Sequence, residues 1–89
     1  MGEQKFREFC TNVLIDYIRT HLDPAEDVAI TTDKIYLVWM CKTLQNNKAL
    51  FSTTLHDGKY YEFTYNGDKK ELYMDCYAKI ENVCVKVGE

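Results

Sequence analysis

The sequence has little proline and glycine, with one proline and four scattered glycines in 89 residues. Single glycines cannot form the glycine-rich loop that cradles a phosphate, so that class of nucleotide site is excluded. No stretch approaches the roughly 20 consecutive apolar residues that a membrane-spanning helix needs. The N-terminal MGEQKFREF also lacks the apolar run of a secretory signal. We therefore expect no membrane segment and a protein that folds where it is made.

Metal-binding spacing is missing as well. Structural zinc sites usually present closely spaced ligand pairs, because each pair must reach one ion from a short turn. We expect reduced thiols that pack as small hydrophobic groups, with no metal, cofactor or native disulfide. No C-x-x-C pair occurs, and the histidines stand apart from the cysteines: Cys10, Cys41, Cys76, Cys84, His21 and His56.

Catalytic motifs are not found. No serine or cysteine has a histidine and an acid at a spacing that suggests an activated nucleophile. Glu62 with His56 could make an acid–base pair, but both fall at a predicted hairpin, where polar residues are expected for solvation. We therefore expect a protein that is not an enzyme.

What is present is the composition of one small globular domain spanning residues 1–89. Hydrophobic residues make up 46% and charged residues 28%, which excludes disorder and low complexity. The formal net charge is −3, which argues against bulk attraction to nucleic acid or to an anionic membrane.

Residues 3–22 have the apolar spacing of an amphipathic helix. The pattern stops at Asp23-Pro24, because proline disfavours helical geometry at the residue before it. We expect this helix to dock on a sheet of its own chain. Its apolar face consists of Phe6, Phe9, Cys10, Val13, Leu14, Tyr17, Ile18 and Leu22.

Three strands are expected next, at about 34–44, 48–55 and 59–65, since these segments are rich in β-branched and aromatic residues. Residues 27–32 are either a short edge strand or a loop. A three-residue turn with a left-handed Gly58 would pair Phe51 with Phe63 and Ser52 with Glu62. One face of the sheet then holds Ala49, Phe51, Leu55, Tyr61, Phe63 and Tyr65.

A second helix is expected from about 68 to 83, with Asn66 or Asp68 as its cap. Residues 84–87 could instead close the chain as a short extended tail. The predicted fold is α+β with two layers, a three-stranded antiparallel sheet with two helices on one face, in the order α-β-β-β-α. The helical stripe consists of Leu72, Tyr73, Cys76, Tyr77, Ile80, Val83 and Cys84.

The first predicted strand is apolar on both of its faces. The helices can cover only one face of the sheet, so the other apolar face stays exposed. We favour an inward Trp39, which a three-residue turn near Asn46 and Asn47 would align with Phe51; a two-residue turn there would reverse the choice. An exposed apolar patch of this kind usually marks a protein–protein interface. We expect another protein, or a second copy in a homodimer, to bind this patch. The alternative is that the N-terminal tail or the segment near residue 30 folds over it. The predicted partner-binding residues are Tyr36, Val38, Met40, Leu50 and Tyr60, with Glu62 on the rim.

Nucleic-acid binding is the alternative. The predicted element order is that of double-stranded RNA-binding domains, whose second helix opens with lysines against phosphate. The negative net charge and Glu71 weaken this reading. The lysines that would bind an anion are Lys42, Lys48, Lys69 and Lys70.

Several runs carry a family resemblance: VWMCKTLQN at 38–46, KAL at 48–50, STT at 52–54, DG at 57–58, YYE at 60–62 and TYNGDKKE at 64–71, with Tyr77. Over roughly residues 5–87 the chain resembles a family of small uncharacterised proteins encoded by phages and prophages of low-GC Gram-positive bacteria. The resemblance implies expression in the host cytoplasm and carries no catalytic or binding residue with it. We therefore expect a phage accessory protein that binds a host or defence protein, for example to inhibit a CRISPR nuclease.

Overall fold

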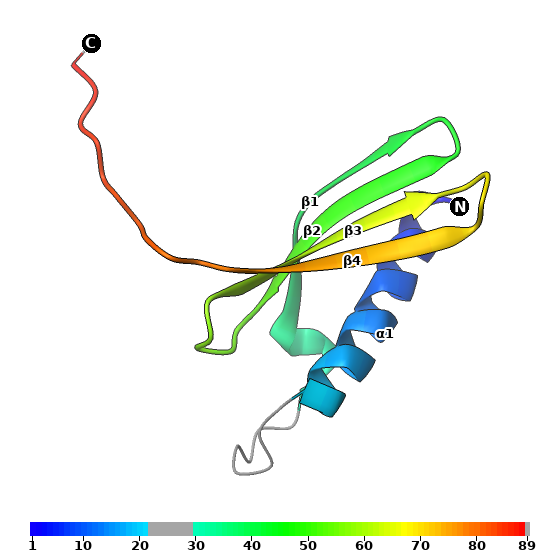
Figure 1. Ribbon diagram of the computed structural model, residues 1–89, viewed down its shortest axis with the longest axis horizontal. Helices are drawn as coiled ribbons and strands as arrows, with labels where there is room; N and C mark the ends of the chain where they lie inside the picture. Colours follow the sequence, from blue (N-terminus) through cyan, green and yellow to red (C-terminus); the bar gives the residue numbers. More distant parts are fainter. Residues whose placement is uncertain (22–29, 89) are drawn as a thin grey trace.

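The computed structural model describes residues 1–21 and 30–88. One helix packs on one face of a four-stranded antiparallel sheet, and the strands follow one another in the order β1-β2-β3-β4 (Figure 1). The fold is therefore a two-layer α+β arrangement. Its elements are α1 (Glu3–His21), the 3₁₀ turn η1 (Thr32–Lys34), β1 (Ile35–Thr43), β2 (Asn46–Thr53), β3 (Lys59–Asn66) and β4 (Glu71–Ala78).

The predicted N-terminal helix is confirmed as α1. Its buried side chains recur every three or four residues and form one stripe against the sheet. Arg19 lies in the last turn, where its positive charge complements the helix dipole. The predicted stop at Asp23-Pro24 lies outside the described residues. The buried stripe consists of Phe6, Cys10, Leu14, Ile15 and Ile18.

The core lies between this stripe and the inner face of the sheet. Ala49, Phe51, Tyr61 and Phe63 supply the sheet side and are almost completely buried. The rings of Phe51 and Phe63 meet edge to face, with centroids 5.6 Å apart and planes at 85°. Leu55 and Tyr65 pack against this cluster, so the predicted inner face is confirmed.

The pairing of β2 with β3 differs from the predicted register by two residues. Phe51 lies opposite Tyr61, and Ala49 lies opposite Phe63. The connection from Thr53 to Lys59 is longer than the expected three-residue turn, and Gly58 adopts the expected left-handed conformation with φ +65°. A shift of two residues leaves every side chain on its face, so the predicted core face is unchanged by it.

The predicted second helix is wrong. Residues 71–78 form β4, which pairs with β3 from Asn66↔Glu71 to Lys59↔Ala78. The apolar residues of this segment fit a helical stripe, but Leu72 and Met74 also alternate with the exposed Tyr73. β3 carries the buried Tyr61, so the backbone groups along its second edge need hydrogen-bond partners. Residues 71–78 supply those partners when they form a strand.

The predicted helix cap is a turn instead. The Asn66 side-chain oxygen accepts hydrogen bonds from the backbone amides of Asp68, at 3.1 Å, and Lys69, at 3.2 Å. These are the amides that a helix cap would satisfy, but Lys70 then enters the left-handed region with φ 53° and the chain reverses. Over residues 1–21 and 30–88 the fold therefore has one α-helix and four strands, not two helices and three strands.

The first hairpin also corrects an expectation. Thr43 lies opposite Asn46, so the turn consists of Leu44 and Gln45, and a bulge lies between Leu37 and Trp39. Trp39 consequently lies opposite Leu50 and faces away from α1, so the predicted inward Trp39 is wrong.

Residues 79–88, which we call the arm, extend away from the body beyond the end of β4 (Figure 1). This matches the alternative of an extended tail. Lys79 is still attached, because its amide donates to the Gly58 carbonyl at 2.8 Å. Within the described residues, the structure contains no helix long and apolar enough to cross a membrane.

Candidate functional site

The sheet face opposite α1, which we call the outer face, is rich in aromatic residues. Cross-strand neighbours form three rows on it, because side chains alternate between the two faces of a strand. The first row is Tyr36, Ser52, Tyr60 and Tyr77; the second is Trp39, Leu50, Glu62 and Asp75; the third is Cys41, Lys48, Thr64 and Tyr73.

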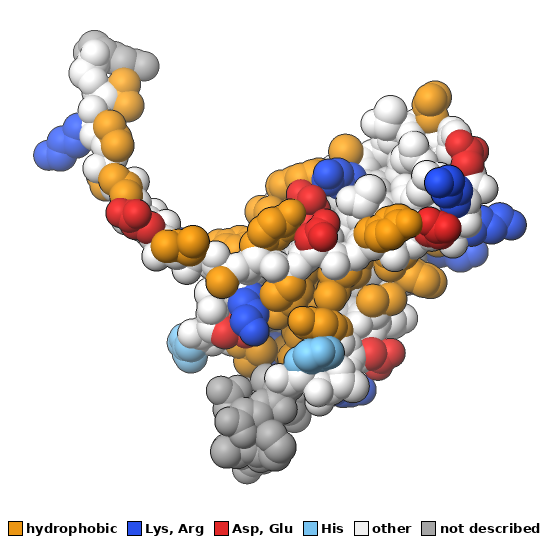
Figure 2. Space-filling model, in the orientation of Figure 1, with side chains coloured by type: hydrophobic (Ala, Val, Ile, Leu, Met, Phe, Trp, Pro, Cys, Tyr) orange, Lys and Arg blue, Asp and Glu red, His pale blue; other side chains and the backbone are white. Residues whose placement is uncertain are grey.

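Much of this aromatic surface reaches solvent. The exposed fractions are 46% for Tyr36, 40% for Trp39, 56% for Tyr73 and 51% for Tyr77. Figure 2 shows hydrophobic and acidic side chains alternating along β4, with further hydrophobic groups continuing onto the arm. α1 covers the inner face only, so no described element covers the outer one.

Acidic groups outnumber basic ones on this face. Glu62 forms an ion pair with Lys48, with 3.5 Å between Oε1 and Nζ. Asp75 lies beside Glu62 in the same row, and Glu71 accepts a 2.6 Å hydrogen bond from the Tyr73 hydroxyl. That hydrogen bond, together with the negative charge of Glu71, raises the pKa of Tyr73.

This combination is suited to binding a protein. Tyrosine and tryptophan bury a large area and offer a polar tip, and their faces attract a guanidinium or an ammonium group. Carboxylates beside the rings can pair with the same cation. The outer face therefore favours a partner surface that presents arginine or lysine among apolar groups.

The predicted partner-binding residues divide between the two faces. Tyr36, Leu50, Tyr60 and Glu62 lie on the outer face. Val38, the extra residue at the β1 bulge, is 46% exposed.

Met40 is the exception. It lies opposite Ala49 and packs against the core, so its predicted place on the exposed face is wrong. The bulge shifts the alternation by one residue, so Leu37 and Met40 both face α1.

Sequence reasoning missed three residues of the outer face. The three-residue turn expected near Asn46 and Asn47 predicts an inward Trp39, and a bulge leaves no clear signal in a strand that is apolar throughout. The helical spacing predicts Tyr73 and Tyr77 on a helix. Their alternation with Leu72, Met74 and Cys76 was the signal that could have placed them.

The lysines predicted to bind an anion do not gather. Lys48 lies on the outer face in an ion pair, whereas Lys42 lies opposite Asn47 on the other alternation. Lys69 and Lys70 lie in the turn between β3 and β4, not at a helix start. The helix N-terminus that was expected to help them hold a phosphate is therefore missing from the described residues.

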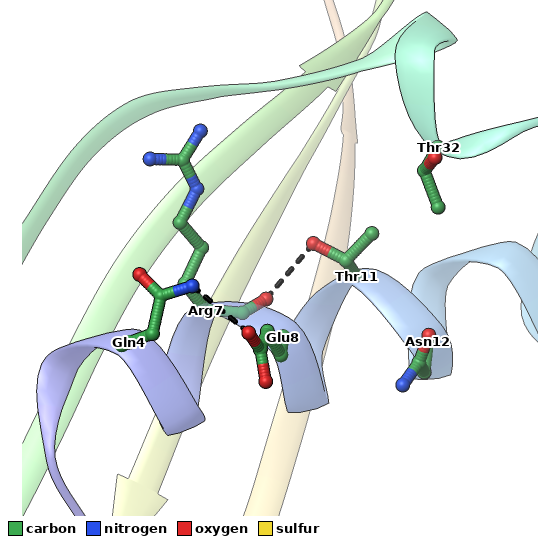
Figure 3. Close-up of a pocket in the computed structure, with 6 residues that line it drawn as sticks. All are labelled: Gln4, Arg7, Glu8, Thr11, Asn12 and Thr32. Atoms are coloured by element: carbon green, nitrogen blue, oxygen red, sulfur yellow. Dashed lines mark hydrogen bonds between the residues drawn. The ribbon is translucent and has the colours of Figure 1, made fainter.

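A shallow groove of about 310 Å³ lies between α1 and η1 (Figure 3). Gln4 Nε2 donates to Glu8 Oε1 at 2.9 Å, and the Thr11 hydroxyl donates to the Arg7 carbonyl at 2.8 Å. The Arg7 guanidinium projects away from these groups in the close-up. Most of its lining residues are exposed positions of α1, and both of these hydrogen bonds lie within α1. The lining residues are Gln4, Arg7, Glu8, Thr11, Asn12 and Thr32.

The groups considered for catalysis and metal binding are dispersed. Glu62 pairs with Lys48, while His56 is exposed in the β2–β3 connection; within residues 1–21 and 30–88 no hydrogen bond joins the two. The same residues contain no cluster of three or more metal-ligating side chains. All four cysteines are free thiols, and burial raises the pKa of Cys10 to about 12.

A family model covers residues 7–87 of the chain, almost the whole of the described sheet and helix. The chain belongs to a family of unknown function, DUF6275. This confirms the general part of the resemblance, membership of an uncharacterised family. For this DUF6275 protein, a search of curated proteins and a search of solved structures found no match.

Proposed function

We propose that this DUF6275 protein is a non-enzymatic binding module that contacts a protein partner through its outer face. The proposal rests on one observation: Tyr36, Trp39, Tyr73 and Tyr77 are each at least 40% exposed on a sheet face that no described element covers. Aromatic residues are enriched at protein interfaces because they bury much area at low entropic cost.

The charge of the face specifies the partner's chemistry. Among the described residues of the outer face, Glu62, Asp75 and Glu71 are acidic and Lys48 is basic. The net charge of the chain is −3. A phosphodiester backbone would be repelled, whereas a basic protein surface would be attracted. A groove that normally holds nucleic acid is a surface of this kind.

The biological context of the proposal comes from the resemblance to phage and prophage proteins. We propose a partner in the bacterial host cytoplasm, and a nucleic-acid-binding defence protein such as a CRISPR nuclease is the first class to test. Inhibition would follow if the outer face occupied the basic groove of such a protein. This step goes beyond membership of the family.

The test compares two variants whose substituted residues have similar exposure. Tyr36→Glu with Trp39→Glu alters the outer face, and Phe9→Glu alters an aromatic residue on α1 that is 45% exposed. Tagged protein is used to capture partners from the host lysate, and each captured protein is then purified and titrated by calorimetry. We expect the outer-face variant to lose at least tenfold in affinity and Phe9→Glu to bind as the wild type does. Equal binding by both variants would overturn the proposal.

Nucleic-acid binding is a second candidate, because exposed aromatic rings on a four-stranded sheet can stack unpaired bases. The lysines predicted for it are Lys42, Lys48, Lys69 and Lys70, of which Lys48 shares the outer face with the rings. Fluorescence anisotropy with single-stranded and double-stranded RNA at low salt tests it. Binding that weakens with salt and in Lys69→Glu would support this candidate over the first.

A further inference from the structure

The arm has the composition of a β-strand without a neighbour. Val83, Val85 and Val87 alternate with polar or small residues and are 65%, 77% and 78% exposed. Beyond Lys79, no residue of the arm has a hydrogen bond or ion pair with the described part of the chain. An extended segment with apolar side chains and free backbone groups is a template for pairing with another strand.

β4 offers the matching edge. It is the last strand of the sheet, and no described strand lies beyond it. The Lys79 amide donates to Gly58, so the odd-numbered residues of β4 direct their backbone groups toward β3. The even-numbered residues therefore direct theirs toward the free edge. These residues are Leu72, Met74, Cys76 and Ala78.

We propose that the arm of a second copy of this chain pairs antiparallel with β4, and that the exchange is reciprocal about a two-fold axis at Ile80. The two four-stranded sheets then join into one continuous sheet. Both copies use the same β4 edge and the same arm, as an isologous interface requires. The inference does not rest on the proposed function, because it is argued from the backbone edge of β4 and from the arm.

The charges near the axis select the register. With Ile80 opposite Ile80 of the partner subunit, Lys79 lies opposite Glu81 of the partner subunit, an attractive pair. Two neighbouring registers keep the same hydrogen-bonding alternation. One places Lys79 opposite the partner's Lys79, and the other places Glu81 opposite the partner's Glu81. Like charges directly opposite each other destabilise a strand pair.

The same register places apolar groups together. Tyr77 lies opposite the partner's Val83, and Tyr73 lies opposite the partner's Val87. Aromatic and β-branched pairs of this kind stabilise antiparallel strands. Cys76 lies opposite the partner's Cys84 on the other alternation, and both thiols are exposed in the single chain.

The arm cannot easily return to its own β4. It continues that strand directly, and no glycine or proline occurs between Lys79 and Val87 to make a tight turn. The other hairpin connections contain Gly58 and Gly67 or, in the first hairpin, a left-handed Leu44. A second copy is therefore the occupant that the pattern favours.

The first test is the oligomeric state of the full chain by sedimentation equilibrium. We expect a dimer at tens of micromolar, and at least a tenfold weaker dimer for Val83→Asp with Val87→Asp. The matched control is Leu44→Asp, since Leu44 is 81% exposed but lies in a turn away from the arm. The fold of each variant is checked by circular dichroism, and the outer-face variant Tyr36→Glu with Trp39→Glu should still dimerise. A monomeric wild type, or a dimer that the arm substitutions leave unchanged, would overturn the inference.

The second test determines the register of the strand pair from which cysteines form a disulfide. In a Cys41→Ser background, copper phenanthroline takes one electron from each thiol and both protons leave, so that Cys76 of one copy bonds to Cys84 of the other. A hydrogen-bonded strand pair separates its Cα atoms by about 5.5 Å, within the range of a disulfide. We expect peptide mapping to find this bond and Cys84→Ser to abolish it. Cys84–Cys84 bonds as the main product would contradict the register.

A pair of proline substitutions tests the pairing directly. Lys86→Pro removes an amide that faces β4 of the partner subunit, whereas the Val85 amide faces away. We expect Lys86→Pro to weaken the dimer at least fivefold more than Val85→Pro does. Equal effects would show that the arm does not pair as a strand.

Discussion

Trp39 lies directly opposite Leu50, one residue after a bulge that leaves Val38 without a partner on β2. The bulge lets Leu37 and Met40 both face α1 while Trp39 faces the other way. A regular strand would have placed Trp39 on the same side as Leu37. One inserted residue therefore adds the chain's single tryptophan to the outer face.

Asn47 is expected to cost stability. Its side chain is 2% exposed on β2, and neither Nδ2 nor Oδ1 has a hydrogen-bond partner among the described residues. An unsatisfied buried amide costs about 1–3 kcal/mol, so Asn47→Leu should raise the free energy of unfolding by about 1 kcal/mol or more. Urea unfolding followed by circular dichroism measures this.

Asn46→Leu is the matched control for that experiment. The Asn46 side-chain oxygen accepts a 3.1 Å hydrogen bond from the Gly67 amide. Its replacement should therefore lower stability by about 0.5–1.5 kcal/mol. A loss of stability in Asn47→Leu similar to that in Asn46→Leu would contradict the first prediction.

Gly67 is expected to tolerate no side chain. A Cβ there would overlap the Gln45 carbonyl oxygen, because the β1–β2 and β3–β4 turns touch. Gly67→Ala must push the turns apart and weaken the 2.7 Å hydrogen bond from Gln45 Nε2 to Asp68 Oδ2. We expect a loss of about 1–3 kcal/mol in the free energy of unfolding. Gly2→Ala, with nothing within 4 Å of its Cβ, should be neutral; a neutral Gly67→Ala would refute the close approach.

The protein should lose stability in alkali through two buried groups. Burial raises the pKa of Cys10 from 9.0 to about 12, and burial with the nearby charge of Asp57 raises the pKa of Tyr61. Well below pH 9 both groups are protonated in the folded and unfolded states, so they add no pH dependence there. Above it the unfolded state releases these protons first, and stability falls as the pH rises.

Urea midpoints measured between about pH 8 and pH 11 test this behaviour. The variant Cys10→Ala with Tyr61→Phe should show a flatter fall than the wild type, whatever its stability at neutral pH. Parallel curves for the two proteins would assign alkaline unfolding to other groups.

The cysteines should separate by reactivity. Cys41, Cys76 and Cys84 are exposed, whereas Cys10 is buried with a raised pKa, so little reactive thiolate forms there. At low protein concentration we expect Ellman's reagent to modify three thiols quickly and the fourth only after urea is added. Rapid modification of Cys10, identified by peptide mapping, would mean that α1 opens readily.

The helix and the core face could be predicted from the sequence because both depend on local periodicity. Phe6, Cys10, Leu14 and Ile18 repeat every four residues, and a helix is the simple structure that places them together. The core face tolerated an error in register, because a slip of two residues preserves the alternation.

β4 and the bulge could not be predicted in this way. Leu72, Cys76 and Ile80 satisfy a helical spacing, yet the free hydrogen-bonding edge of β3 turns the segment into a strand. That edge exists only once the sheet has assembled, so the local sequence pattern cannot show it. As a result Tyr73 and Tyr77 moved from an expected helix to the outer face.

The meander order has a consequence for how quickly the sheet can form. Each strand pairs with its neighbour in the chain, across short connections at 44–45, 54–58 and 67–70. Closing such short loops costs little chain entropy, so the hairpins can assemble one after another. Docking of α1 joins the most distant parts of the chain and completes the core. We therefore expect α1 to contribute more to resisting unfolding than to the initial rate of folding.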